Sequence, residues 1–269
     1  MKVLVLDGYN LMYRAYHGNR FGEHHTIFNF FRSLRPIIEK FSPDKAYFVI
    51  EGVPVQNIEI HPGYKANRPS TASTKFIDHK DVCIELISES FPITVVRHPK
   101  YEADDVVDGI IRYWHPKDDV TIVSSDTDFI QILNEFGDVR LWNPIRKQFI
   151  AAPDYDYVTW KALRGDSADA IPGIRGVGDK TAERMIADPA LMEAKLSDST
   201  NRELFERNLA LIKFARLKDD MSVLEVSNPS KNWEGVRSVF ERYEFSSIIN
   251  NKSWPKFVNT FEPLWNVAG

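Results

Sequence analysis

Nine carboxylate side chains in this 269-residue chain occupy positions from which they could act on one substrate. Asp7 and Glu51 each end a short apolar run, and Asp126 follows another. The whole set is Asp7, Glu51, Glu102, Asp104, Asp105, Asp126, Asp128, Asp166 and Asp169. Carboxylates that lie close together repel one another unless protons or divalent cations offset their charge. The set therefore predicts a cation site.

The type of ligand atom indicates which cation. The nine side chains offer hard oxygen atoms and neither nitrogen nor sulfur, a donor set that favours Mg²⁺ or Mn²⁺. Two such ions about 3.5–4 Å apart activate a water molecule and stabilise the leaving oxygen in phosphodiester hydrolysis. The alternative is that each acid is a helix N-cap or a solvated loop residue. Their joint placement favours metal binding.

The charge balance fits a polyanionic substrate once these acids are set aside. The chain has 34 Lys and Arg against 38 Asp and Glu, a formal net charge of −4. Without the nine acids the remainder carries +5, which suits a nucleic-acid backbone. The overall acidity therefore does not count against a nucleic-acid substrate.

A glycine-rich segment, 173–182, joins two stretches of helical periodicity. Glycine permits positive φ and close backbone approach, so N–H groups at the start of the second helix can meet a phosphate. Gly176 and Gly178 would form this turn, and Arg175 and Lys180 would add positive charge. The alternative is an ordinary helix hairpin with a glycine C-cap.

A second candidate for substrate contact is the run from His61 to Phe76, which contains no acid. Tyr64 could stack on a base, and Lys65 or Arg68 could stabilise charge on the transferred phosphoryl group. The alternative is a solvated basic loop. Prolines and a Ser/Thr cluster predict that 54–73 is a long excursion from the core.

Four short β-branched runs alternate with longer amphipathic stretches in the first half of the chain, a pattern typical of βαβ units. The predicted strands are 3–6, 46–50, 93–96 and 120–123. Apolar residues recur at helical spacing in 30–41 and 106–114. This alternation predicts an α/β fold with a mostly parallel sheet flanked by helices. In such a fold the ligand site lies beyond the carboxyl ends of the strands, where Asp7, Glu51 and Asp126 fall.

The second half of the chain has a helical pattern. We predict helices at 158–164, 180–187 and 202–217, and a smaller helical domain that begins near residue 153. The spacing of Asp166 and Asp169 predicts that both lie on one face of a helical turn.

Cysteine use and the first residues indicate the cellular setting. Cys83 is the single cysteine, so neither an intrachain disulfide nor a cysteine-based zinc cluster can form. The start of the chain matches neither a signal peptide nor a membrane span. We therefore expect a cytoplasmic protein, in a bacterial or phage-infected cell.

Five ordered sequence blocks resemble those of the 5′ nuclease (flap endonuclease) family, above all its stand-alone bacteriophage enzymes and the 5′–3′ exonuclease domain of bacterial DNA polymerase I. The blocks are 6–11, 64–69, 102–105, 125–128 and 165–173, and the likeness extends over residues 1–224. The resemblance implies a PIN-like nuclease core over 1–152, with a helical arch at about 54–90. It also implies a helical region over 153–269, whose helix-three-turn-helix motif spans about 155–190, and a K⁺ ion at the glycine turn.

Matching positions imply a role for each candidate residue. The residues implied for the first metal site are Asp7, Glu51, Glu102, Asp104 and Asp105. The residues implied at or between the two sites are Asp126 and Asp128, and those of the second site are Asp166 and Asp169. The residues implied at the arch base, near the scissile phosphate, are Tyr64, Lys65 and Arg68. The residues implied to contact duplex DNA are Arg175, Gly176, Gly178 and Lys180. Glu51 departs from the family, which usually has Asp there.

The resemblance implies a monomeric, structure-specific 5′ nuclease that removes primers or flaps from DNA or RNA–DNA in replication and repair. Two alternatives stay open at this point. A PIN-type endoribonuclease would share the acids at the strand ends but would need neither Asp166 and Asp169 nor the glycine turn. A noncatalytic DNA-junction-binding protein should have lost carboxylates that this chain retains.

Overall fold

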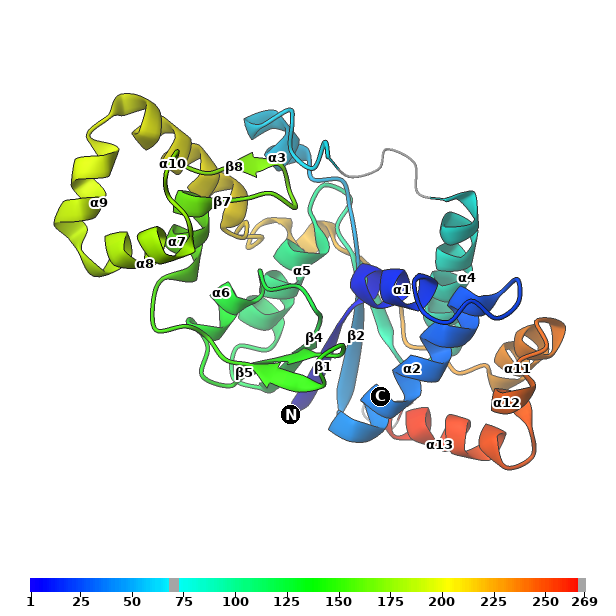
Figure 1. The fold of residues 1–269 in the computed structure, drawn as a ribbon. Coiled ribbons are helices and arrows are strands. Elements are labelled where there is room, and N and C mark those ends of the chain that lie inside the picture. Colours follow the sequence, from blue (N-terminus) through cyan, green and yellow to red (C-terminus); the bar gives the residue numbers. More distant parts are fainter. Residues whose placement is uncertain (68–72, 266–269) are drawn as a thin grey trace.

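A seven-stranded sheet organises the chain in the computed structural model, which describes residues 1–67 and 73–265 (Figure 1). The strand order is β6-β5-β4-β1-β2-β3-β9. The strands are β1 (Lys2–Asp7), β2 (Lys45–Ile50), β3 (Thr94–Arg97), β4 (Asp119–Val123), β5 (Val139–Asn143), β6 (Gln148–Ile150) and β9 (Glu225–Val226). Neighbours from β5 to β3 pair in parallel, and the edge strands β6 and β9 pair antiparallel. The carboxyl ends of the parallel strands therefore meet at one edge.

Both faces of the sheet are apolar and covered by helices. Leu4 and Leu6 of β1 pack on one side, and Val3 and Val5 pack on the other. The helices on the first face are α1 (Gly8–Tyr16), α2 (His25–Phe41), α4 (Thr74–Ser90), α11 (Trp233–Arg242), α12 (Ser246–Ile249) and α13 (Ser253–Trp265). The second face carries α5 (Ala103–Gly109), a π-helical turn (Ile110–Trp114) and α6 (Ile130–Leu133). The predicted α/β class, with a mostly parallel sheet flanked by helices, is confirmed.

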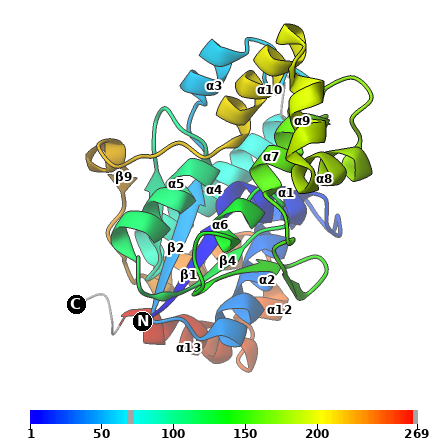
Figure 2. The ribbon, with the colours of Figure 1, turned by 90° about the vertical axis from the view of Figure 1, so that its left-hand side faces the viewer.

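A third apolar cluster lies beyond the carboxyl edge of the sheet (Figure 2). Its elements are α7 (Tyr157–Arg164), β7 (Gly165–Asp166), β8 (Ile171–Pro172), α8 (Asp179–Ala187), α9 (Pro189–Leu196) and α10 (Ser199–Ile212). The fully buried Asn208 amide of α10 donates hydrogen bonds to the carbonyl oxygens of Ala162 and Pro172, at 3.0 and 2.8 Å. The strands β7 and β8 form a small hairpin. The order along the chain is therefore α7, this hairpin, the glycine turn and α8.

The chain after α10 returns to the main sheet. A 3-10 turn (Asp220–Val223) leads into β9, which pairs with β3, and α11 to α13 then pack on α2. Phe31 of α2 lies 5.2 Å from Phe91 and 5.2 Å from Phe240, measured between ring centroids. The predicted boundary at 153 stays a prediction, but the residues after it do not form one packing unit.

Two local expectations are wrong. Asp166 and Asp169 do not lie on a helical turn, because the chain between them reverses in the β7–β8 hairpin. The Asp166 carboxylate accepts a hydrogen bond from the Ala168 N–H at 2.8 Å, as in a tight turn. Ala170 has a φ of 58°, which is not a helical value. The hydrogen bond and this φ both favour a tight reversal over a helix.

The predicted helix 202–217 ends early, at Ile212. The Phe214 N–H donates to the side chain of Gln131 at 3.1 Å, and the Ala215 N–H donates to Asp105 at 2.8 Å. These side chains take the place of the helical carbonyl acceptors, so the chain leaves the helix.

The predicted arch, 54–90, includes α3 (Val55–Ile60), residues outside the described part of the chain, and α4. α3 contacts α10. In contrast, α4 buries Phe76, Cys83 and Ile87 in the apolar cluster on the first face of the sheet. The extent of the arch stays a prediction. Among the helices that the structure describes, none is long and apolar enough to cross a membrane.

Candidate metal centre

Four acids gather where the parallel strands end, and we call them the sheet-edge acids: Asp7, Glu51, Asp104 and Asp126. Asp7 is the last residue of β1 and the N-cap of α1. Its buried carboxylate accepts hydrogen bonds from the Ser124 hydroxyl at 2.6 Å and from the Asn10 N–H at 3.1 Å. The strand end and the helix start therefore fix its position together.

The sheet-edge acids repel one another. Burial raises the pKa of Asp7 to about 7, and the charges of Glu51 and Asp126 add to this increase. The hydrogen bonds from Ser124 and Asn10 act in the opposite direction and lower the pKa. Burial also raises the pKa of Asp104 well above its ordinary value, together with the charges of Asp126, Asp7 and Glu51. Without a cation, this group tends to hold protons.

Glu102 and Asp105 begin α5 and have other partners. They form a capping box in which each side chain accepts from the other's backbone N–H. Both oxygens of Asp105 are engaged, Oδ1 by Ala215 N–H at 2.8 Å and Oδ2 by Glu102 N–H at 3.4 Å. Asp105 therefore ties α5 to the chain after α10, and a direct metal role for it stays a prediction.

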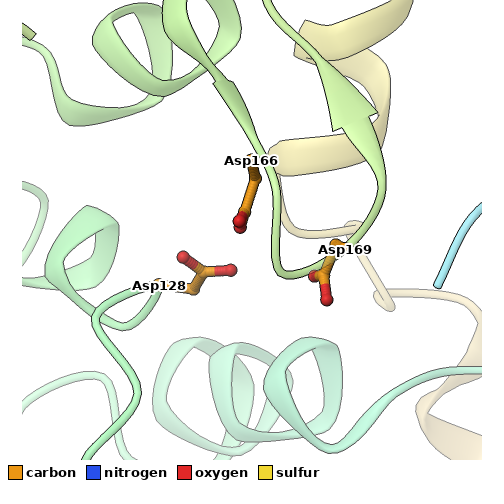
Figure 3. Close-up of side chains that lie close together, drawn as sticks. All are labelled: Asp128, Asp166 and Asp169. Carbon is orange, nitrogen blue, oxygen red and sulfur yellow. The ribbon is translucent and has the colours of Figure 1, made fainter. Parts of the chain in front are cut away.

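Three further acids form a tight group, which we call the hairpin cluster: Asp128, Asp166 and Asp169. One carboxylate oxygen from each lies within 4.8 Å of the others (Figure 3). Asp166 and Asp169 project from the β7–β8 hairpin, and Asp128 projects toward them from the segment after β4. The hairpin thus replaces the predicted helical turn and still brings both acids together.

Lys161 lies inside the hairpin cluster and was missed by sequence reasoning. Its ammonium forms ion pairs with Asp128 and, at 2.6 Å, with Asp166. Burial raises the pKa of Asp166, but the Lys161 charge outweighs it, so the pKa lies below its ordinary value. Burial raises the pKa of Asp128 to about 6 against the opposing effect of Lys161. The available signal was a lysine on the buried side of α7, five residues before Asp166.

The basic segment around residue 65 reaches the same site. The Tyr64 hydroxyl donates to Glu102 at 2.6 Å, and the Lys65 ammonium pairs with Glu102 and lies 3.9 Å from Asp169. Lys65 has a φ of 56°, and its N–H donates to the Asp169 carbonyl at 2.9 Å. The Asn67 amide donates to the Ser167 carbonyl at 2.5 Å. This segment is therefore docked on the hairpin, and its strained backbone lies at the site.

The remaining predicted positions are elsewhere. Arg68 lies outside the described residues. Gly176 has a φ of 82°, which favours glycine, and Gly178 is the N-cap residue of α8. Arg175 and Lys180 are exposed on either side of this turn.

One sheet-edge acid, Asp104, and the hairpin cluster line the same cavity. A cavity of about 50 Å³ is lined by Glu102, Asp104, Asp128, Lys161 and Asp166, together with Tyr64 and Asp169. The oxygen-only donor set and the mutual repulsion of the carboxylates fit divalent cations, which would replace protons and ammonium groups as counter-charges.

The chain is similar in sequence to known proteins. The sequence profile of a family described as "5′-3′ exonuclease, N-terminal resolvase-like domain" matches residues 2–161. The chain is 27% identical over 278 residues to the thermostable DNA polymerase I of Thermus filiformis, covering 93% of this chain and 33% of the polymerase. It is 30% identical over 209 residues to DNA polymerase I of Treponema pallidum, covering 68% and 20%. The chain thus spans a third or less of these relatives.

Solved structures show the same fold. The T5 D15 protein, co-crystallised with metal ions, superimposes with a TM-score of 0.66 at 17% identity, covering 100% of both chains. The catalytic core of Rad2, in complex with a DNA substrate, superimposes with a TM-score of 0.55 at 17% identity, covering 99% of this chain and 92% of that one. The resemblance seen in the sequence is confirmed, and the chain belongs to the 5′-3′ exonuclease family, as a carrier of its N-terminal resolvase-like domain.

Proposed function

We propose that this chain is a divalent-metal-dependent 5′ nuclease that hydrolyses phosphodiesters at 5′ ends and at flap junctions of DNA. The observation that carries the proposal is one cavity lined by Asp104 from the sheet side and by Asp128 and Asp166 from the hairpin side. Lys65 and Tyr64 both contact Glu102, which lines the same cavity. Acids alone would fit many roles, whereas acids beside docked basic and aromatic side chains fit phosphoryl transfer.

The acids would hold two Mg²⁺ or Mn²⁺ ions. The residues proposed for the first ion are Asp7, Glu51, Glu102, Asp104 and Asp105, and those for the second are Asp166 and Asp169. Asp126 and Asp128 would lie at or between the two ions. When bound, such ions polarise the phosphate and assist the attacking water and the leaving oxygen. The Glu51 carboxylate accepts from the Ala103 N–H at 3.5 Å, so the edge of β2 places it beside α5.

The chain's own cations would orient the phosphate. Lys65 is held by its ion pair with Glu102 and by its backbone bond to Asp169, so its ammonium is fixed before substrate arrives. A phosphate at the site would offer this ammonium an anionic partner in addition to Glu102 and Asp169. Tyr64, buried against the α7–α10 cluster, would fix the position of Glu102. Arg68 is proposed to add a second positive charge.

Two surfaces would hold the nucleic acid. On one side of the site, the exposed N–H groups at the start of α8, with Arg175 and Lys180, would grip duplex phosphates, and K⁺ is proposed at this turn. On the other side, a groove of about 640 Å³ runs past Asn10 and Ser125. Arg14 and Arg32 line it, and no acid is among the described residues that do so. A strand passing through the site could therefore be bound on both sides.

The biological role is part of the same proposal. The DNA polymerase I relatives support work in replication and repair, in which primers or flaps of DNA or RNA–DNA are removed. We further propose that the chain acts as a monomer and in the cytoplasm, where the single cysteine, Cys83, would stay reduced.

Cleavage assays test the proposal directly. The protein is incubated with a 5′-labelled flap duplex, a blunt duplex and a single-stranded RNA, each with Mg²⁺ or with EDTA, and the products are mapped on a gel. We expect Mg²⁺-dependent cuts at the flap junction or from the 5′ end. Cleavage of RNA alone would favour the PIN-type ribonuclease, and binding without cleavage would favour the junction-binding protein.

A matched pair of variants separates the site from general effects of charge. Asp128→Asn removes an acid that follows the carboxyl end of β4, whereas Asp119→Asn removes one at the opposite end of the same strand, where it pairs with Arg140. We expect Asp128→Asn to lose cleavage and Asp119→Asn to retain it. Equal loss in both variants would contradict the assignment.

A further inference from the structure

Lys161 stands where one of the proposed ions would be bound. Its ammonium contacts Oδ1 of Asp128 and, at 2.6 Å, Oδ2 of Asp166, two of the three acids of the hairpin cluster. The Lys161 side chain is 7% exposed, and those of Asp128 and Asp166 are 16% and 14% exposed. The ion pair is therefore part of the interior of the site.

The helix that carries Lys161 is firmly anchored. Ala162 and Leu163 are fully buried in the α7–α10 cluster, and the Ala162 carbonyl accepts from Asn208. Three residues further along the same helix, Arg164 pairs at 3.0 Å with the exposed Asp179. The same helix thus directs Lys161 into the hairpin cluster and Arg164 toward the surface. Of the two, Lys161 is the one buried with its partners.

A divalent ion and this ammonium would compete for the same oxygen atoms. An ion bound between the acids of the hairpin cluster would use carboxylate oxygens that Lys161 now contacts. The ion and the Lys161 ammonium would then lie side by side, and two cations so close repel each other strongly in a buried site. Without any cation, three carboxylates with oxygens within 4.8 Å would repel each other in turn. The ammonium therefore satisfies the cluster when no ion is bound and opposes the ion that replaces it.

Asp7 differs in this respect, although the Lys65 ammonium pairs with Glu102 at the first proposed site. Asp7 accepts hydrogen bonds from two uncharged donors, the Ser124 hydroxyl and the Asn10 N–H. Such donors fix the carboxylate without supplying the positive charge that a bound ion would displace.

We propose that Lys161 is a resident counter-ion of the hairpin cluster, which holds the metal-free site together and must be displaced before the second divalent ion binds. The proposal rests on the metal site described above and adds an internal competitor to it. It follows that the second ion binds more weakly than it would without this ammonium, because only the fraction of molecules with a displaced ammonium is competent to bind it.

Removing the ammonium tests this role without measuring cleavage. Mn²⁺ is titrated into the protein, free Mn²⁺ is followed by electron paramagnetic resonance, and thermal unfolding is recorded with EDTA and with saturating Mn²⁺. In Lys161→Met we expect the second Mn²⁺ to bind about tenfold more tightly or better. We also expect a lower unfolding temperature in EDTA and a larger rise on adding Mn²⁺ than in the wild type.

Three further variants make the outcome decisive. Lys161→Gln removes the charge but keeps a hydrogen-bond donor, so it should behave as Lys161→Met does. Lys161→Arg should retain the weak second site. Arg164→Met removes a positive charge from the same helix outside the cluster and should leave both Mn²⁺ affinities within about twofold of the wild type.

Each result supports or overturns the proposal. Unchanged or weaker binding of the second Mn²⁺ in Lys161→Met and Lys161→Gln, with the wild type binding two ions, would overturn it and leave the metal site intact. If both variants are unfolded in EDTA, folding on addition of Mn²⁺ supports it, and failure to fold at any Mn²⁺ concentration overturns it. A wild type that binds no Mn²⁺ would overturn the metal site and this proposal with it.

Discussion

The two halves of the acidic site solve the same electrostatic problem differently. At the sheet edge, the buried Asp7 and the half-buried Asp104 lie beside other acids, and their raised pKa values mean that protons offset the repulsion. At the hairpin, the Lys161 ammonium offsets it instead, and the pKa of Asp166 lies below its ordinary value. The sheet edge therefore relies on protons, whereas the hairpin relies mainly on an internal cation and keeps one raised pKa, that of Asp128, although both line or adjoin one cavity.

The difference follows from the elements that carry the acids. Parallel strands deliver their last residues to one edge, and this edge places Asp7, Glu51 and Asp126. The hairpin cluster lies between the sheet and α7, whose lysine can reach in from the side. The predictions below test whether the halves are distinct in function as well as in charge.

The largest effect is expected from the sheet edge. Asp104→Asn should lower single-turnover flap cleavage about 1,000-fold, since a ligand change at the site removes several kcal/mol of transition-state stabilisation. The free energy of unfolding in EDTA should not fall, because the neutral amide resembles the protonated acid that burial favours. Cleavage is measured in a rapid-quench assay and stability by urea unfolding.

Asp105→Asn is the matched control in the adjacent residue. The backbone N–H groups of Glu102 and Ala215 each donate to one oxygen of Asp105. An amide has only one oxygen, so one of these donors would face an NH₂ group and lose its acceptor. The free energy of unfolding should therefore fall by about 1–3 kcal/mol. If Asp104→Asn lost stability and Asp105→Asn did not, the assignment of the two carboxylates would be reversed.

At the hairpin, Asp166→Asn should lower single-turnover cleavage about 100-fold while duplex affinity stays within about twofold. The variant weakens one proposed ion but leaves the glycine turn and its exposed Arg175 and Lys180 unchanged. Fluorescence anisotropy with a flap duplex in Ca²⁺ measures the affinity. Wild-type cleavage in this variant would remove Asp166 from the catalytic site.

The pH dependence of stability should report Asp7 together with Asp105 and Asp128, whose pKa values burial raises to about 7 and about 6. Burial raises the pKa of Asp7 to about 7, so the folded chain holds a proton that the unfolded chain has already released. The metal-free protein should therefore lose stability as pH rises, by about 2 kcal/mol from Asp7 between pH 5.5 and 7. Burial lowers the pKa of His79 to about 4, which gives the opposite slope below pH 6.5.

Urea unfolding in EDTA at several pH values, with Asp7→Asn beside the wild type, separates these contributions. The variant should lose less stability than the wild type over this range, because His79 is common to both. A slope of the same size in both proteins would show that Asp7 does not hold the proton.

The smallest effect is expected outside both halves, at the glycine turn. Gly176→Ala should lower the free energy of unfolding by about 1 kcal/mol, because its φ of 82° disfavours a side chain. Duplex affinity should fall by a few fold, whereas cleavage of bound duplex should be unchanged. Gly178→Ala is the control, since its φ is −102° and a Cβ there meets no atom within 4 Å. Equal losses in both variants would argue against a conformational role for Gly176.

The sequence was sufficient for the parts of the site that depend on regular alternation. Strand ends are marked by apolar runs, so the convergence of Asp7, Glu51 and Asp126 could be predicted before any coordinates. The hairpin between Asp166 and Asp169 could not, because a three-residue spacing is shared by a helical turn and a tight reversal. Whether Lys161 points inward depends on the packing of α7 against α10, which no local pattern encodes.

Long-range contacts explain the other differences. The helix before Lys213 ends because Gln131 and Asp105, distant in sequence, bind the next backbone N–H groups. The last helices return to α2 because Phe240 and Phe261 complete its aromatic core. Helical periodicity predicts such elements but not the surface against which they pack.

The central claim is that one site has two cation positions, one at the sheet edge and one at the hairpin. Counting bound Mn²⁺ per chain by electron paramagnetic resonance tests it most directly, in the wild type, Asp104→Asn and Asp166→Asn. The account predicts two ions in the wild type, with one of them lost in Asp104→Asn and the other lost in Asp166→Asn. A single ion in the wild type, or loss of the same ion in both variants, would contradict it.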